Sequence, residues 1–411
     1  MADYMHEMVR MQAHAALARL AQCALLGAPP PTGNLSAMPA VDAALNAAQR
    51  AMLEDDDRDA VAAAMEAAAE VVKSVGAAAG GGIAHLHSAG HITGLADHCL
   101  AVLEGRAMCQ EGEDEEGGGG AGGEDEEEDE EAELGQIVLE GCAELLPALA
   151  TIAGASFAPA FKPHFAALLR RTGANRPEGQ RSVAYATLVE VVRAIGSAAT
   201  PVVPLALPGC LRELRAAETA GLRRNCTYCA GVMVEVGGAA AAPFHGALAQ
   251  ALAHLLSSKE PDRGVRDNAA SSAARLLSVD GCAAVRDPAV GPPLVSLFLA
   301  ALPLVEDFEE AASAYGGVCA LLRSGDPGVS AHVPRMLQVI GQVAAEEAGK
   351  EAEEPITAQG GEADRVPAEV LAAMGRTVAD LLAQFPAQIS PVLAALPAEH
   401  QTAVRALMPP A

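Results

Sequence analysis

Residues 218–237 read ETAGLRRNCTYCAGVMVEVG, and the spacing of their apolar side chains decides the fold class. The apolar positions follow one another at steps of 4, 3, 4 and 3 residues: Leu222, Cys226, Cys229, Met233 and Val236. This is the period of an α-helix that buries one face. A second apolar stretch, 244–256, comes after a break of Gly, Ala and Pro. We therefore expect two amphipathic helices joined by a short turn.

The same helical pair recurs along the chain. First helices are expected to begin near residues 177, 218, 260 and 305, and Tyr185 and Tyr228 are 43 positions apart, as are Asn225 and Asn268. Units of about 40–47 residues are typical of HEAT and armadillo repeats, whereas tetratricopeptide and ankyrin units are shorter. Two helices per unit favour HEAT repeats. The sequence thus predicts an all-α fold, a HEAT-repeat α-solenoid of about eight helix pairs.

Two polar interruptions divide the chain into five expected segments. Residues 111–133 hold 14 acids and seven Gly without one Lys or Arg, so they offer no apolar face and are predicted to be a disordered loop. The segments are 1–110 (degenerate HEAT repeats), 111–133 (acidic loop), 134–345 (core HEAT repeats), 346–365 (polar loop) and 366–411 (a C-terminal capping repeat).

The charge balance indicates what kind of partner the chain binds. The 411 residues are 51% hydrophobic, which excludes wholesale disorder, and 53 acids against 27 Lys and Arg give a net charge of −26. Such an excess argues against direct nucleic-acid binding, which needs clustered cations. Partners recognised by charge should therefore be basic.

The cysteines and apolar runs bear on the cellular compartment. Nine scattered cysteines, an odd number, fit reduced thiols in the cytosol or nucleus better than a secreted disulfide scaffold. Charged residues interrupt the first apolar stretch, so no signal peptide is expected. The uncharged runs 194–211 and 288–305 contain three and four prolines, too many for a membrane-spanning helix. We expect no membrane insertion.

The sequence offers little that resembles catalytic chemistry. Cys226 and Cys229 form a CxxC motif without a second ligand pair or a βαβ context, and both fall on the buried stripe, so small core residues are the preferred interpretation. His85, His87 and His91 form a cluster in which His87 and His91 are expected one helical turn apart, close enough to share a metal ion. No HExxH carboxylate joins them, and helix-surface histidines are the alternative. We predict no enzyme activity, no cofactor and no metal site.

Two groups of acids are the candidate contacts for a basic partner. The acidic loop either keeps an apolar solenoid in solution or attracts basic ligands over long range, and composition does not choose between these. The second group precedes a helix, where acids also favour the helix dipole. The candidates are Glu124, Asp125, Glu126, Glu127, Glu128, Asp129, Glu130, Glu131, Glu306, Asp307, Glu309 and Glu310. Asn225, Asp267 and Asn268 are expected to bridge neighbouring repeats instead.

Three stretches resemble the importin-β (karyopherin-β) superfamily, specifically the C-terminal half of its importin-4-like branch. The first is the acidic tract with LEGCAELLPALATIAG and SFAPAFKPHFAALL, which begin at Leu139 and Ser156. The second is LRRN from Leu222, followed by YCAGVMVEVGG, APFHGALAQALAHLL and VRDNA. The third is LPLVEDFEE from Leu302. The resemblance covers about 130–345 well and the remainder loosely.

The resemblance implies a nuclear transport receptor, or its cargo-binding part. Such proteins carry basic cargo such as histones and ribosomal proteins through nuclear pores, so cytoplasm and nucleus are the implied locations. Phe-Gly repeats of nucleoporins are possible further partners. Family members release cargo under control of the Ran GTPase, which their N-terminal repeats grip. Those repeats are not recognised in these residues, so Ran binding is expected only if they are supplied. The alternative is a HEAT scaffold or regulatory subunit without transport activity.

Overall fold

The computed structural model describes residues 6–27, 33–78, 81–110, 124–257, 260–279, 291–353 and 365–409. Within these ranges the secondary structure consists of α-helices and short 3-10 helices, without a strand. The chain divides into two compact units, residues 1–202 and 203–411, and each is described by itself. The predicted all-α fold is confirmed.

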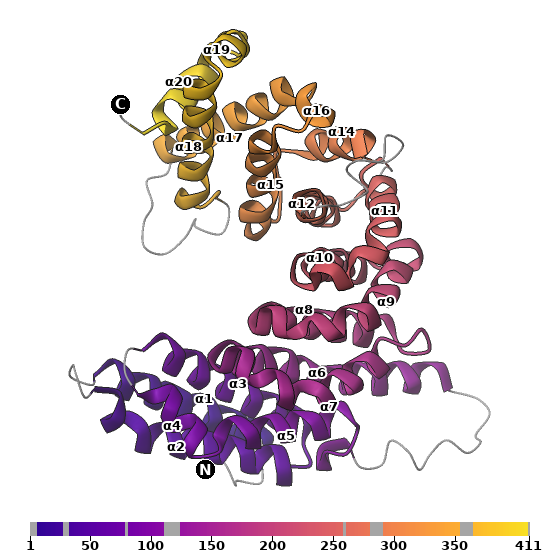
Figure 1. Ribbon diagram of the computed structural model, residues 1–411. Helices are drawn as coiled ribbons and strands as arrows, with labels where there is room; N and C mark the ends of the chain where they lie inside the picture. Colours follow the sequence, from indigo (N-terminus) through magenta and orange to yellow (C-terminus); the bar gives the residue numbers. More distant parts are fainter. Residues whose placement is uncertain are drawn as a thin grey trace. The chain divides into compact units, whose positions relative to one another are not determined.

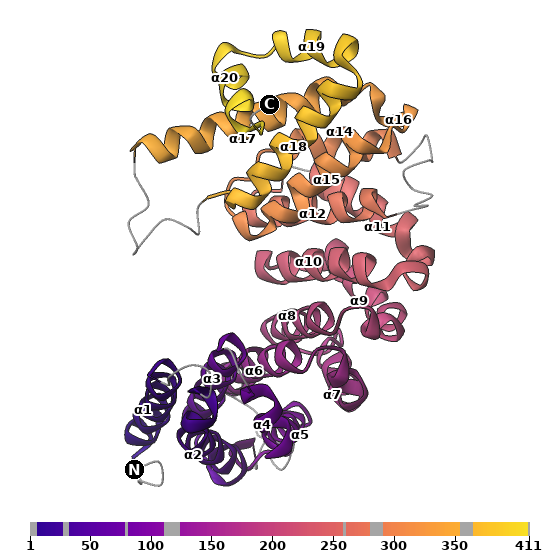
Figure 2. The ribbon, with the colours of Figure 1, turned by 60° about the vertical axis from the view of Figure 1, so that its left-hand side comes forward.

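The first unit is a stack of helices in two rows (Figures 1 and 2). The first row is α1 (Glu7–Leu26), α3 (Arg58–Ala77), α6 (Glu124–Ala153) and α8 (Glu178–Ile195). The second row is α2 (Gly33–Glu54), α5 (His91–Leu103) and α7 (Ala158–Arg171), with α4 (Gly82–Ser88) and the 3-10 helices η1 (Met108–Gln110), η2 (Gly154–Phe157) and η3 (Gly196–Val202) between the rows. Each helix contacts the next one in its row. Neighbouring pairs therefore bury each other's apolar faces, as the HEAT prediction requires.

The second unit repeats this arrangement. Its first row is α10 (Ala220–Gly237), α12 (Arg263–Ser278), α15 (Ala311–Ser324) and α18 (Ala368–Gln384). Its second row is α9 (Val203–Ala216), α11 (His245–Ser257), α14 (Gly291–Ala301), α17 (Val333–Glu353) and α20 (Ala398–Leu407). The connecting helices are η4 (Gly238–Ala240), η5 (Ala242–Phe244), η6 (Phe308–Glu310), α16 (Pro327–Ser330) and α19 (Pro386–Ala394). Consecutive members of each row are again in contact.

Local sequence signals set the ends of first-row helices. Three first-row helices have an N-cap side chain that accepts the backbone N–H three residues further on. These are Asp57 before α3 at 2.8 Å, Thr219 before α10 at 3.4 Å and Asp262 before α12 at 2.8 Å. Such caps satisfy donors that a helix leaves unpaired. Gly196, with φ of 59°, follows the last residue of α8, because glycine adopts this backbone conformation without strain.

The structure differs from the predicted loop boundaries. Helix α6 already begins at Glu124, within the segment predicted to be a disordered loop up to residue 133, while 111–123 lie outside the described residues. Helix α17 continues to Glu353, through the first eight residues of the predicted polar loop, and 354–364 lie outside the described part. Glutamate is a good helix former, and carboxylates near a helix N-terminus favour the helix dipole. Acidic composition alone was therefore a poor marker of the loop ends.

Two apolar stretches are each divided into two helices in the structure. The stretch 85–103 is split into α4 and α5 at Gly90, where φ is 77°. The stretch 389–407 is split into α19 and α20 before Pro397, the residue that precedes α20. Both breaks are at residues that a helix interior disfavours. The positions of these two breaks could thus have been predicted from Gly90 and Pro397 in the sequence.

Two continuous helical stretches, Gly135–Arg171 and Glu178–Ala216, are long and apolar enough to pass a membrane-span test based on length and composition. Their most apolar windows are 50% and 39% buried within the protein. Gly154 and Gly196 interrupt both stretches with φ of 55° and 59°, so neither is one straight helix. They have the composition of core helices in a stack, which must be apolar on more than one face.

Helix α12 shows how closely the first-row helices approach. Gly317 of α15 faces it, and a Cβ added there would lie 3.0 Å from the Cα of Ala274, whereas a Cβ on Gly316 would meet nothing within 4 Å. We predict that Gly317→Ala destabilises the second unit by about 1–3 kcal/mol through overpacking. Gly316→Ala should instead stabilise it by up to about 1 kcal/mol, because alanine favours a helix.

Urea unfolding of the two single variants tests this pair. The adjacent positions share the same helix and the same chemical change, so helix propensity alone would move both free energies in the same direction. Equal stabilisation by the two substitutions would contradict the close approach of α12 and α15.

Candidate functional site

The loop that leads into α15 is held by a buried carboxylate of α12. The Oδ2 atom of Asp267 accepts the backbone N–H groups of Val305, Glu306 and Asp307 at 2.9, 2.7 and 3.0 Å. Asp267 is only 2% exposed. These three hydrogen bonds are charge-assisted, because their common acceptor is a carboxylate oxygen. Asp267 thus bridges neighbouring repeats, as the sequence predicted.

Asn268 fastens the same loop by a side-chain contact. Its Nδ2 donates to Oδ2 of Asp307 at 2.7 Å and to the carbonyl oxygen of Gly264 at 2.9 Å. Burial raises the pKa of Asp307, and the negative charges of Glu310 and Asp267 act in the same direction, while the bond from Asn268 opposes them. The predicted bridging role of Asn268 is therefore confirmed.

Arg224 of α10 joins three successive segments at the surface. Its Nη2 donates to Asp262 at 3.3 Å and to Glu306 at 3.0 Å. Burial works to lower the pKa of Arg224, but the two carboxylates outweigh that effect and raise it. Glu306 is half-exposed, so one side of its carboxylate remains open to water.

A second arginine makes the most enclosed ion pair of this region. The guanidinium of Arg275 on α12 contacts both carboxylate oxygens of Glu310 at 2.6 and 3.3 Å, and its Nε donates to Glu235 at 3.2 Å. It also lies 5.3 Å from the centre of the Tyr228 ring. The side chains of Arg275 and Glu310 are 9% and 8% exposed. This cluster connects α10, α12 and η6.

The four predicted acids of this group therefore differ in their surroundings. Asp307 and Glu310 are bound within the chain, and Glu306 is shared between Arg224 and solvent. Glu309 is exposed, and its side chain makes no hydrogen bond or ion pair with the residues that the structure describes. None of the four caps α15 through its side chain: its N-cap, Glu310, makes no such bond.

The other predicted group lies in the first unit. Residues 124–131 form the first turns of α6, whose side chains at these positions the structure does not describe. Later residues of α6 pack against α3 and α8. The structure thus assigns the two acidic groups to different units.

The histidine cluster is arranged differently from the sequence prediction. His87 and His91 are not one turn apart on one helix, because Gly90 separates α4 from α5. Instead, Nε2 of His85 and Nε2 of His91 lie 2.8 and 2.9 Å from the same oxygen of Asp42 on α2. No group of three or more His, Cys, Asp or Glu side chains among the described residues has an arrangement that could hold a metal ion.

The Asp42 contact makes a pH-dependent contribution to stability. Burial works to raise the pKa of Asp42, but the hydrogen bonds from His85 and His91 outweigh it and lower that pKa below 3.8. A carboxyl group whose pKa is lower in the folded than in the unfolded protein stabilises the folded state at pH values above the unfolded-state pKa. This stabilisation is lost as the pH falls through the folded-state pKa. We predict that Asp42→Asn reduces the unfolding free energy at pH 6 and has little effect near pH 2.

Thermal denaturation of wild type and Asp42→Asn across this pH range provides the measurement. Asp56→Asn removes an exposed carboxylate just after the C-terminal end of α2 and serves as the control. A difference between wild type and Asp42→Asn that is the same at both pH values would refute the prediction.

The two cysteines of the CxxC motif are core residues. Cys226 and Cys229 are both 0% exposed, and burial together with the neighbouring Cys210 raises the pKa of Cys229. The Cys229 thiol is therefore protonated and a poor nucleophile or metal ligand. This confirms the preferred interpretation of the motif.

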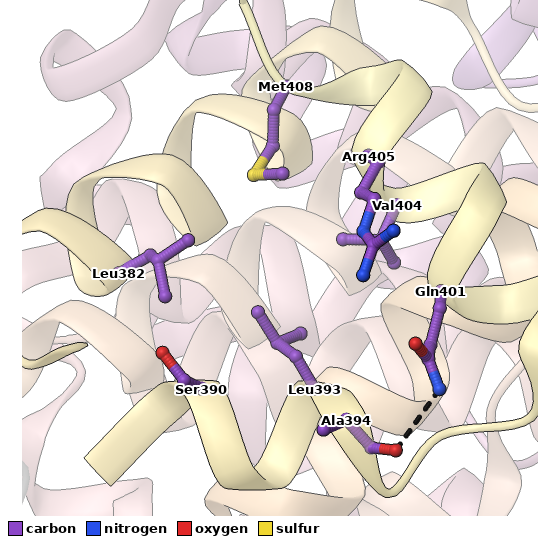
Figure 3. Close-up of a pocket in the computed structure, with 8 residues that line it drawn as sticks. All are labelled: Leu382, Ser390, Leu393, Ala394, Gln401, Val404, Arg405 and Met408. Carbon is purple, nitrogen blue, oxygen red and sulfur yellow. Dashed lines mark hydrogen bonds between the residues drawn. The ribbon is translucent and has the colours of Figure 1, made fainter. Parts of the chain in front are cut away.

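A small apolar pocket lies between the last three helices of the second unit (Figure 3). Its volume is about 160 Å³. Its wall is mostly apolar, with one arginine at its side: Leu382, Ser390, Leu393, Ala394, Gln401, Val404, Arg405 and Met408. Gln401 is turned back onto the backbone, donating to the carbonyl oxygens of Ala394 and Leu396 at 3.1 and 2.9 Å. The pocket has room for one apolar side chain of a partner.

The fold is similar to that of solved karyopherins. Kap121p bound to the SUMO protease Ulp1p aligns with 98% of the chain and 34% of its own length, at a TM-score of 0.65 and 13% identity. Importin beta aligns with 96% of the chain and 49% of its own length, at a TM-score of 0.56 and 13% identity. At this identity the similarity defines the class of fold: the helix-pair stack of a karyopherin.

Sequence comparison with curated proteins identifies the branch. The chain is 34% identical to human Importin-4 over 310 residues, 74% of the chain and 27% of that protein. It is 32% identical to mouse Importin-4 over 262 residues, 64% of the chain and 22% of that protein. No family model matches. The chain belongs to the importin-β superfamily, in its importin-4-like branch, and spans about a quarter of the length of these relatives.

Proposed function

We propose that this chain is the cargo-binding part of an importin-β-type nuclear transport receptor that carries basic proteins, such as histones or ribosomal proteins, into the nucleus. The observation that carries the proposal is the 34% identity to Importin-4 over 310 residues. The excess of 53 acids over 27 Lys and Arg supports a basic cargo. Three of the similar Kap121p structures contain bound Ulp1p, Pho4p or Ste12p.

We assign to cargo the acids of the acidic segment and those acids of the second group that remain exposed. Residues 124–131 supply eight carboxylates at the start of α6, and Glu306 and Glu309 add two exposed carboxylates in the second unit. Asp307 and Glu310 position the loop before α15 through Asn268 and Arg275 instead. In this proposal, long-range attraction by the acidic segment raises the encounter rate, and the exposed acids of the helix rows add short-range contacts.

The further partners in this proposal follow the family resemblance. The receptor would cycle between cytoplasm and nucleus through the nuclear pore, with the pocket between α18 and α20 as one place for a nucleoporin phenylalanine. Ran-GTP would release cargo only when the N-terminal repeats that grip it are supplied. The chain itself would perform no catalysis.

A binding titration with immobilised histone H3–H4 or a basic ribosomal protein tests the proposal. Converting the acids at 124–127 to their amides should weaken binding about tenfold at low salt and flatten its salt dependence. The matched control removes four exposed acids elsewhere in the same unit: Glu54, Asp56, Asp59 and Glu66. Both variants change the net charge equally, so a general charge effect would weaken binding in both.

The alternative is a HEAT scaffold without a transport role. The Asp267 and Arg275 networks would serve that role equally well, since they hold the repeats together. Failure of basic proteins to bind at low salt would refute the transport proposal and leave the scaffold. Addition of Ran-GTP to the bound complex distinguishes regulated release from simple retention.

A further inference from the structure

One surface of the first unit has the opposite charge from the chain as a whole. Residues 145–177 contain four Lys or Arg and no Asp or Glu, although the net charge of the chain is −26. They include α7 and the turn that leads from it to α8. Helix α5 lies beside α7, and the turn after α5 adds Arg106 (Figure 1). Electrostatic attraction at this surface therefore favours an acidic ligand.

Glu104, which ends α5, shows how these cations bind a carboxylate. Nε of Arg106 donates to Oε2 of Glu104 at 3.0 Å, and Nη2 of Arg170 donates to Oε1 at 3.1 Å. The hydrogen bond from Arg106 lowers the pKa of Glu104 most, and Arg170 adds to that effect against the small opposing effect of burial. Arg106 and Arg170 are 59% and 60% exposed. Two accessible guanidinium groups thus share a single carboxylate.

Further cations extend this surface along α7. Lys162, Ala166 and Arg170 are exposed and spaced by four residues, so they lie along one side of the helix. The two cations are about 12 Å apart along the helix axis. Lys162 and Arg176 are exposed, and their side chains make no hydrogen bond or ion pair with the residues that the structure describes. We call Arg106, Lys162, Arg170 and Arg176 the basic patch.

We propose that the basic patch binds an extended acidic segment of a partner protein, which displaces Glu104 from the two arginines. Guanidinium groups match the geometry of a carboxylate through paired N–H donors. The separation of Lys162 and Arg170 corresponds to about four residues of extended peptide, so acids within one short segment can reach both. A single small anion cannot. This partner differs from the basic cargo, and the inference does not rest on the transport proposal.

An acidic peptide fits the basic patch better than a nucleic acid does. The anionic group that the structure shows between Arg106 and Arg170 is a carboxylate. The nearby rings of Phe157, Phe161 and Phe165 are buried, so none of them is available to stack on a base. A duplex would also approach the many acids of the surrounding chain, whereas a short peptide contacts the patch alone.

Fluorescence anisotropy of a labelled oligoglutamate peptide of about eight residues, titrated with the full chain at about 20 mM salt, tests the proposal. Arg170→Gln should weaken binding about fivefold, which is the loss expected for one exposed ion pair. Glu104→Gln should instead tighten binding by a similar factor, because it releases both guanidinium groups from their own chain. Circular dichroism melting checks that each variant remains folded.

An exposed ion pair on α8 supplies the matched controls. Glu190 and Arg193 lie 3.7 Å apart in the same unit and are of the same two residue types. Glu190→Gln and Arg193→Gln should each change peptide binding by less than about twofold, although they change the net charge as the test variants do.

Four results would overturn the proposal. The first is a wild type that does not bind the peptide, and the second is shifts at positions 190 and 193 as large as those at 104 and 170. The third is duplex DNA that binds more tightly than the peptide and responds to Arg170→Gln, which would assign the patch to nucleic acid. The fourth is peptide binding that appears only after deletion of residues 111–123, which would assign the patch to the chain's own acids.

Discussion

Replacing Arg275 by alanine is expected to lower the unfolding free energy of the second unit by about 3–5 kcal/mol. The change removes the partner of Glu310, whose side chain is only 8% exposed and contacts Arg275 at 2.6 Å. A carboxylate left unpaired in such surroundings loses its compensation for the water it gave up on folding. The substitution also removes the ion pair of Arg275 with Glu235 and its cation–π contact with the Tyr228 ring.

Chemical denaturation followed by far-ultraviolet circular dichroism measures this loss. Tryptophan fluorescence is not an option, because the chain has no Trp. Arg224→Ala is the control within the same unit, because its pair with Glu306 is far more exposed and should contribute at most about 1 kcal/mol. Adding Glu310→Gln to Arg275→Ala should restore part of the stability. Equal small effects of both arginine variants would show that the Arg275 pair is dispensable.

Asp267→Ala is expected to cost about 3 kcal/mol, because three backbone N–H groups lose a common buried acceptor. Part of the loss is recovered where the exposed loop residues reach water. Asp267→Asn keeps an oxygen of the same shape without its charge, so its effect should be about half as large.

Hydrogen exchange locates this second effect. The amides of Val305, Glu306 and Asp307 should lose protection in Asp267→Ala, while those in the middle of α10 keep theirs. Uniform loss of protection across the second unit, or none at residue 306, would contradict the assignment of Asp267 as the anchor of this loop.

The candidate site shows where sequence reasoning succeeded. Asp267 and Asn268 were predicted to bridge neighbouring repeats, with Asn268 43 positions after Asn225, and the structure shows both side chains, on α12, bound to the loop before α15. The signal was available because adjacent repeats pack in one register, so residues at equivalent positions face the next repeat. Arg224 and Arg275 were missed as partners, since charge pairs between helices leave no fixed spacing in the chain.

The histidines illustrate the opposite case. Sequence spacing grouped His87 with His91, whereas the structure pairs His85 with His91 through Asp42, which is over forty positions earlier. Nothing near His85 in the sequence indicates Asp42. Only the packing of α2 against α4 and α5 brings that carboxylate to both rings.

The order of residues is enough to establish the all-α class, the pairing of helices and the period of the repeat, because helical periodicity and glycine or proline breaks act over a few residues. It also establishes the acid excess, on which the proposal of a basic partner rests. Tertiary structure alone decided which acids are free: Glu310 and Asp307 are held by α12, while Glu309 is not. That choice depends on which side chains neighbouring helices bring within about 3 Å, a distance that the order of residues along one helix does not encode.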